Sequence, residues 1–188
     1  MFAFALGAIP VAGAIVPGAA RAESGRPLYV APVFGARSFE SKLDLETEAA
    51  VGARLGAGVN DRVTVWMDAI HSVPARKTTG RLVYVTALRG LAQCRLLVRS
   101  AIHPYLVAGV GGILFNFGDT TDTAGGEVTL GGGVEYRVAP RACLFGEFTD
   151  DFYRSRSVVY GSTGEEISST PRSTDTARTF AIGLAVGL

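Results

Sequence analysis

Apolar residues alternate with small or polar residues along most of the chain, which is the period-two pattern of half-buried strands. In residues 127–138, one face carries Val, Leu, Val, Tyr and Val around one glycine. The opposite face carries Glu, Thr, Glu and Arg with two glycines. The triplet Gly131–Gly132–Gly133 is unsuited to a helix, because glycine loses the most backbone freedom when it is ordered. This segment is therefore predicted to be a strand.

Eight segments share this alternation. Their ranges are 28–39, 47–57, 62–71, 81–94, 104–117, 127–138, 142–153 and 177–188. Short linkers alternate with longer polar ones, the longer being 40–46, 72–80, 118–126 and 154–176. An even number of strands of about ten residues, joined by alternating short turns and long loops, is typical of small membrane barrels. The sequence predicts an all-β fold, an eight-stranded antiparallel up-and-down transmembrane β-barrel.

Alternation alone does not say which face of the barrel is inside. A soluble, lipocalin-like periplasmic binding barrel also has eight strands and one apolar face, and it is the alternative. Two features favour the membrane version. The charged face is also rich in glycine, which suits a cramped polar interior, and the apolar face continues to Leu188 with no predicted helix to close a cup. Because alternate residues of a strand share a face, the apolar face then meets lipid. It includes Leu55, Val110, Leu130 and Ile182.

The first 22 residues form a separate unit. Residues 1–20 carry no charge, and Ala20–Arg21–Ala22 is a small-residue cleavage pattern. Pro10 and Pro17 argue against a transmembrane helix, because proline is strongly disfavoured in a helix interior. The segment has no basic residue before Arg21, unlike an ordinary signal peptide. We expect a signal peptide at 1–22 and the barrel domain at 23–188.

Composition excludes several classes of protein. Hydrophobic residues make up 48% of the chain and the net charge is +1, which argues against disorder and against nucleic-acid binding. Two histidines and two cysteines leave little for a metal site, and we expect no cofactor. Cys94 and Cys143 fall on predicted strands that are not neighbours, so a disulfide between them is not expected.

Three segments resemble the small outer-membrane β-barrels of the OmpA-like and OmpX/Ail-like group. They are Pro104–Gly112, Leu130–Arg137 and Leu144–Phe148, and the resemblance covers most of residues 26–188. It implies an outer-membrane location, contact with outer-membrane lipids including lipopolysaccharide, and delivery by the barrel-insertion machinery. It also leads us to expect a monomer. Such barrels usually end in Phe or Trp, and this sequence departs from that pattern at Leu188.

Charged residues on the glycine-rich face are the candidate site. Isolated charges in a narrow lumen are unfavourable, so these groups are expected to pair with one another. The predicted lumen network consists of Glu48, Arg54, Asp68, Arg89, Glu127, Glu135, Arg137 and Glu147. An eight-stranded lumen has just enough room for side chains to fill. We therefore expect a plugged barrel with a structural or surface-interaction role, and a small porin with a narrow polar pore is the alternative.

Four arginines flank the last long loop and could contact anions at the surface. They are Arg154, Arg156, Arg172 and Arg178. The guanidinium group matches phosphate by bidentate geometry, so lipopolysaccharide phosphates or a host surface are candidate ligands. A solvated loop without a partner is the competing interpretation.

No catalytic arrangement stands out. His71–Ser72 is the only adjacent His–Ser pair, but neighbouring residues of a strand point to opposite faces, which is poor geometry for a nucleophile and its base. His103 precedes Pro104 in a predicted turn. We expect both histidines to be solvated loop residues and the protein not to be an enzyme.

Overall fold

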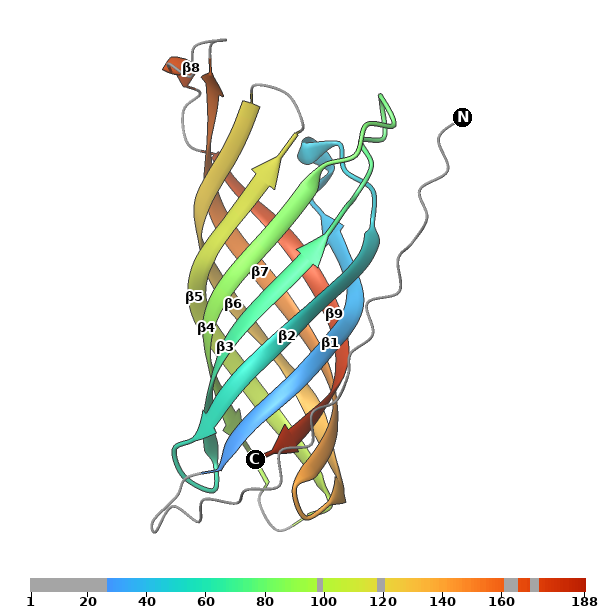
Figure 1. Ribbon diagram of the computed structural model, residues 1–188, viewed down its shortest axis with the longest axis vertical. Helices are drawn as coiled ribbons and strands as arrows, with labels where there is room; N and C mark the ends of the chain where they lie inside the picture. Colours follow the sequence, from blue (N-terminus) through green and yellow to red (C-terminus); the bar gives the residue numbers. More distant parts are fainter. Residues whose placement is uncertain (1–26, 98–99, 118–120, 161–165, 170–172) are drawn as a thin grey trace.

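The computed structural model describes residues 27–97, 100–117, 121–160, 166–169 and 173–188. In this part of the chain, eight long antiparallel strands close into one barrel, tilted to its long axis (Figure 1). They are β1 (Leu28–Phe39), β2 (Glu48–Gly58), β3 (Val63–Ser72), β4 (Tyr84–Arg95), β5 (Ile102–Asn116), β6 (Thr121–Ala139), β7 (Ala142–Tyr160) and β9 (Ser173–Gly187). Pairing of β9 with both β7 and β1 closes the ring. The predicted fold class is confirmed.

Two short elements lie outside the ring. A 3-10 turn, η1 (Ser41–Leu43), is part of the β1–β2 loop, and β8 (Glu166–Ser169) pairs with the end of β7. In the β1–β2 loop, the Lys42 ammonium lies 2.9 Å from a Glu40 carboxylate oxygen and lowers the pKa of Glu40 by hydrogen bonding. No helix of the described residues is long and apolar enough to span a membrane.

The predicted strand positions are correct, but three strands are longer than expected. β6 begins at Thr121, β7 continues to Tyr160, and β9 begins at Ser173. The predicted loops 118–126 and 154–176 are therefore partly strand, and this part of the prediction was wrong. Ladder pairing between β6 and β7 extends to Thr121 and Val159, since β-branched Thr and Val suit a pleated surface despite the polar composition. The predicted signal peptide at 1–22 lies outside the described residues.

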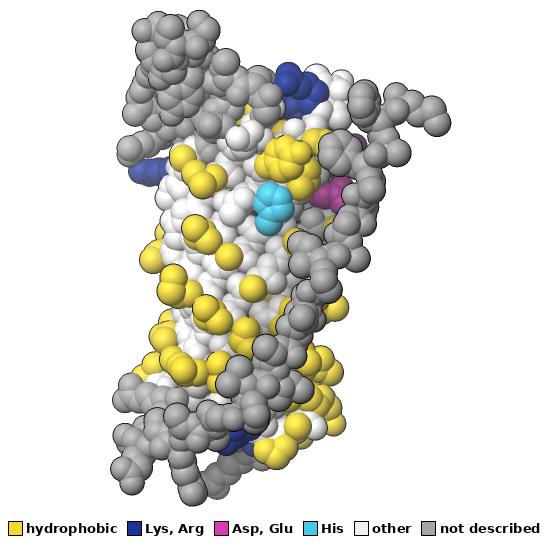
Figure 2. Space-filling model, viewed as in Figure 1, with side chains coloured by type: hydrophobic (Ala, Val, Ile, Leu, Met, Phe, Trp, Pro, Cys, Tyr) yellow, Lys and Arg dark blue, Asp and Glu magenta, His cyan; other side chains and the backbone are white. Residues whose placement is uncertain are grey.

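The outer surface of the barrel carries a belt of aliphatic and aromatic side chains (Figure 2). Leu55, Met67 and Val110 are each more than 60% exposed. The rest of the belt, on every strand of the ring, includes Phe34, Val51, Leu88, Leu106, Leu130, Tyr136, Leu144, Phe148, Phe180 and Ile182. An apolar outer band on tilted strands fits a lipid bilayer. The soluble lipocalin-like alternative, which needs the apolar face inward, is wrong.

Glycines on the inner face let the strands pack closely. A Cβ added at Gly131 would lie 2.2 Å from the Phe148 carbonyl oxygen, and one at Gly35 would lie 2.0 Å from that of Phe180. Backbone atoms cannot move aside easily, so these positions require glycine. Glycines also occur on the outer face, where a Cβ at Gly126 or Gly146 would meet no atom within 4 Å.

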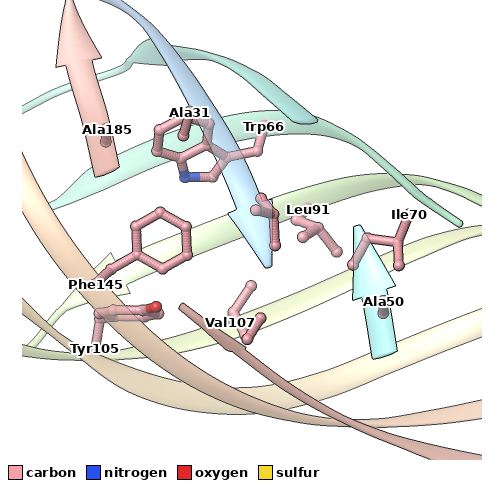
Figure 3. Close-up of a cluster of buried hydrophobic side chains, with 11 residues drawn as sticks. Ala31, Ala50, Trp66, Ile70, Leu91, Tyr105, Val107, Phe145 and Ala185 are labelled. Carbon is pink, nitrogen blue, oxygen red and sulfur yellow. The ribbon is translucent and has the colours of Figure 1, made fainter. Parts of the chain in front are cut away.

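The interior contains two apolar layers that the sequence analysis did not predict. The lower apolar layer lies toward the end with the short turns, and the Trp66, Tyr105 and Phe145 rings gather there inside the strands (Figure 3). The upper apolar layer lies toward the long loops and contains Phe39, Leu45, Val83, Val85, Ala87, Ile113, Phe115, Tyr153 and Ala177. Leu43 and Leu45 come from the β1–β2 loop, so described loop residues help to cap this layer.

Candidate functional site

The inward residues of β7 show the order of the layers in the lumen. Phe145 belongs to the lower apolar layer, Glu147 and Asp151 are buried acids, and Tyr153 belongs to the upper apolar layer. Between the layers lies a set of seven buried charged side chains, here called the central charge cluster. Its members are Arg37, Arg54, Asp68, Arg89, Glu127, Glu147 and Asp151.

Arg54 on β2 joins the acids of β3 and β7. Its Nη2 lies 2.5 Å from one Glu147 carboxylate oxygen, and its Nη1 donates to the other at 3.0 Å. Nη2 also donates to Asp68 at 3.2 Å. The Tyr105 hydroxyl donates to Glu147 at 3.0 Å. A two-pronged pair of this kind fits the fork of a guanidinium to the two oxygens of a carboxylate.

Arg89 and Arg37 complete the central charge cluster. Arg89 donates to Asp68 at 2.6 Å and to Asp151 at 2.8 Å, and Arg37 donates to Asp151 at 3.1 Å. Glu127 lies 3.5 Å from Arg37 and 3.8 Å from Arg89. Because Asp68 is bonded to both Arg54 and Arg89, and Asp151 to both Arg89 and Arg37, the ion pairs form one continuous network across the barrel.

The central charge cluster contacts aromatic rings on both sides. The Arg54 guanidinium lies 5.2 Å from the centre of the Phe145 ring, and that of Arg37 lies 5.7 Å from the centre of the Phe39 ring. Cations over aromatic faces are stabilised by the ring quadrupole. The seven charges comprise four carboxylates and three guanidiniums, so Glu127, with the longest contacts, is the least neutralised acid.

A second polar group lies nearer the short turns. Arg95 donates to Glu135 at 2.6 Å, and the Gln93 amide donates to the same carboxylate at 2.6 Å. The Trp66 indole N–H donates to Gln93 at 2.7 Å. This series of hydrogen bonds fixes the inward direction of Trp66.

The structure brings most of the predicted lumen residues together, with two exceptions. The central charge cluster contains five of them, Arg54, Asp68, Arg89, Glu127 and Glu147. Glu135 pairs with Arg95 in the second polar group, nearer the short turns. Glu48 is only half-buried near the long loops, and Arg137 is exposed at the opposite mouth. Both lie at the strand ends, where the ring opens to solvent.

The sequence analysis missed several polar residues of the lumen, and four of them hold the charges in place. Arg37 and Asp151 are fully buried, and Gln93 and Arg95 hold Glu135. Parity along 28–39 places Arg37 inward with Ala31 and Val33, so the signal was present. Asp151 shares the parity of Glu147 along 142–153, so the signal for its inward direction was present as well.

Two of the four predicted loop arginines have described side chains, and both face outward from strands. Arg178 lies on β9 and pairs with Asp150 at 3.1 Å. Arg154 on β7 lines an outer groove with Gly126, Val128 and Phe152. The side chain of Arg156 and the whole of Arg172 lie outside the described residues.

The prediction that both histidines are solvated loop residues was wrong. His71 lies in β3 beside Tyr84, and its Nδ1 is 2.9 Å from the Thr86 hydroxyl. His103 lies in β5, is 1% exposed, and bonds the Leu97 carbonyl through Nδ1 at 2.7 Å. β5 begins two residues earlier than predicted, because His103 and Pro104 pair with β6. Cys94 and Cys143 are free thiols, as expected.

Solved structures similar to this one include outer-membrane barrels. Neisserial surface protein A matches with a TM-score of 0.63 at 14% identity, covering 86% of this chain and 97% of that one. Outer membrane protein AlkL matches at 0.55 and 16% identity, covering 91% and 94%. Outer membrane protein OprG from Pseudomonas aeruginosa matches at 0.52 and 13% identity, covering 87% and 96%. No family model and no curated protein matches the sequence.

These likenesses show the fold, and the apolar outer belt shows how the fold meets lipid. The resemblance drawn from the sequence is confirmed at the level of architecture. The protein is a small eight-stranded β-barrel with the architecture of transmembrane barrels, and it has its charges inside and its aliphatic side chains outside.

Proposed function

We propose that this barrel is a closed outer-membrane protein with a structural or surface-interaction role, and that its lumen does not conduct. The observation that carries the proposal is the order of the layers. Aromatic and aliphatic side chains lie on both sides of the central charge cluster. A continuous polar pore would need water beside every charge along the axis. Here apolar side chains line the lumen on both sides of the charges, which supports a closed path.

Conductance in planar bilayers tests this proposal. The expected result is the absence of discrete current steps from the refolded wild-type protein. The same preparation must run at different positions on a gel before and after boiling, which shows that a folded barrel was added. Regular single-channel steps from such a preparation would support the small-porin alternative and overturn the closed lumen.

We also propose that the protein is not an enzyme. The described histidines make bonds that leave no serine activated. Nδ1 of His71 is bonded to Thr86, and Nδ1 of His103 is bonded to a backbone carbonyl. A hydrolytic serine needs a base within hydrogen-bond reach and a third group to orient that base. Release of fatty acid from lipopolysaccharide by the purified barrel would contradict this proposal.

Lipopolysaccharide is the proposed surface partner. The outer groove beside Arg154 combines apolar side chains, Val128 and Phe152, with a guanidinium near the long-loop end of the barrel. A phosphorylated glycolipid has the same two parts, an acyl chain and a phosphate. Arg178, with its side chain 71% exposed, lies on the neighbouring strand β9.

A single substitution tests this partner. Arg154→Gln is expected to weaken lipopolysaccharide binding by about tenfold, because one bidentate phosphate contact is lost, equivalent to about 1.4 kcal/mol. Arg141→Gln, at the opposite end of the barrel, is the matched control and is expected to bind like the wild type. Equal affinities for the wild type and both variants would exclude this groove as the site.

A further inference from the structure

A pocket of about 650 Å³ lies at the short-turn mouth of the barrel, on the periplasmic side. It is lined by the β2–β3 turn, residues 59–62, and by Tyr29, Arg95, His103 and Arg137. Short turns mark the periplasmic end in barrels of this class. The pocket lies below the lower apolar layer, so it is separate from the central charge cluster.

The charge of this pocket is positive. Three guanidiniums, those of Arg62, Arg95 and Arg137, face two carboxylates, those of Asp61 and Glu135. Arg95 is already paired with Glu135 at 2.6 Å. For Arg62 and Arg137, the described part of the chain supplies no ion pair with a carboxylate. Two guanidiniums from different elements, the β2–β3 turn and β6, are therefore available to an anion.

His103 supplies an independent sign of a ligand site. Its Nδ1 donates to the Leu97 carbonyl, because a carbonyl oxygen only accepts. Its Nε2 is buried and has no protein partner among the described residues. The side chain is 1% exposed and lines the pocket. Leaving a buried polar atom unpaired is unfavourable, so a group that bonds Nε2 would gain affinity.

These features define the chemistry of the ligand. With Nδ1 protonated, neutral imidazole offers Nε2 as an acceptor, which matches an O–H or N–H of the ligand. The guanidiniums match anionic oxygens arranged in pairs. A phosphate group that keeps one proton presents both functions. A simple carboxylate offers oxygens but no proton for Nε2.

We propose that the periplasmic mouth of this barrel is a binding site for a phosphate-bearing group. Arg62 and Arg137 hold its anionic oxygens, and His103 Nε2 accepts its hydroxyl proton as a hydrogen bond. Glu135 lies opposite His103 in the β5–β6 ladder and keeps Arg95 in place. The ligand is either a soluble phosphomonoester of the periplasm or the phosphomonoester headgroup of a lipid in the inner leaflet.

Titration of inorganic phosphate tests the site directly. The folded barrel is kept in an uncharged maltoside detergent at low ionic strength, and binding is followed by calorimetry or phosphorus NMR. The wild type is expected to bind saturably with one phosphate per barrel. Arg62→Gln and Arg137→Gln are each expected to weaken binding about tenfold, the loss of one charge-assisted contact. Both positions are exposed, so the variants are expected to fold.

Three further measurements keep the proposal falsifiable. Arg141→Gln removes a cation of the neighbouring β6–β7 turn that does not line the pocket, and its affinity is expected to stay within about twofold of the wild type. His103→Phe is expected to lose affinity while the barrel remains heat-modifiable. Acetate is expected to compete poorly. The proposal is overturned by the absence of saturable binding, by an equal loss in Arg141→Gln, or by acetate binding as tightly as phosphate.

Two competitors identify the source of the phosphate. Glycerol phosphate tests a soluble phosphomonoester, and phosphatidic acid added to the micelles tests a lipid headgroup that is likewise a phosphomonoester. Displacement of inorganic phosphate by glycerol phosphate alone would assign the site to a periplasmic solute. Stronger displacement by the lipid, at the same total concentration, would assign it to the inner leaflet. Failure of both to displace phosphate would contradict a phosphoester site.

Discussion

At the scale of single residues, the arginines of the lumen differ in the carboxylates that they neutralise. Among the described residues, Arg54 is the only guanidinium bonded to Glu147, whereas Asp68 and Asp151 are each bonded to two arginines. Removing one partner of a buried ion pair leaves the other charge uncompensated, and this loss usually exceeds the net contribution of the pair. Substitution of Arg54 is therefore expected to destabilise the barrel more than substitution of Glu127.

Substitution at these two positions measures that difference. Arg54→Met is expected to lower the free energy of unfolding by about 3–5 kcal/mol, because the Glu147 carboxylate stays buried without a cation. Glu127→Gln is expected to change it by less than about 1 kcal/mol, since four carboxylates face three guanidiniums and Glu127 has the longest contacts. Urea titrations of the folded barrel in detergent provide the measurement. Equal losses in both variants would contradict the assigned pairing.

Glycines of one strand offer a second test at this scale. Gly131 and Gly126 both lie in β6, but an added Cβ would be 2.2 Å from a backbone oxygen at Gly131 and would meet nothing within 4 Å at Gly126. Gly131→Ala is expected to destabilise the barrel by about 1–3 kcal/mol through overpacking, whereas Gly126→Ala is expected to be neutral. Unfolding midpoints in urea distinguish the two. A destabilised Gly126→Ala with an unaffected Gly131→Ala would mean that the faces of β6 are reversed.

At the scale of the elements, each strand has one face toward lipid and one toward a layered interior. The period-two pattern was enough to find all eight ring strands, because side chains of a strand alternate between faces. It did not find the ends of β6, β7 and β9, where ladder pairing with neighbours, rather than hydrophobicity, holds polar segments in extended form. It also did not find the apolar layers, since Phe145 and Tyr153 are apolar residues on the face assigned to charges.

The two faces of β7 differ in how much their side chains contribute to the stability of the barrel. Phe145 is 8% exposed in the lower apolar layer, and Phe148 is 48% exposed on the outer belt. Phe145→Ala leaves a cavity and is expected to lower the free energy of unfolding by about 3–5 kcal/mol, whereas Phe148→Ala leaves no cavity and is expected to lose less than half of that. The fluorescence of Trp66, the single tryptophan, reports the unfolding. An equal effect at both positions would indicate that the lower layer is not packed.

At the scale of the whole molecule, the account depends on which surface meets lipid. Alternation along the strands alone placed five members of the central charge cluster in the lumen, because a closed barrel turns one face of every strand inward. Parity also places Arg37 and Asp151 inward, but only the three-dimensional register shows that they pair, from the two strands that flank β9. The apolar belt and the buried charges together require a bilayer around the barrel.

The measurement that tests this claim most directly is the gel mobility of the protein in the outer-membrane fraction, compared before and after boiling. A folded barrel that resists detergent migrates differently from the unfolded chain. The account predicts a mobility shift and recovery of the protein in the outer-membrane fraction. Recovery in the soluble periplasmic extract, with no shift on boiling, would contradict it.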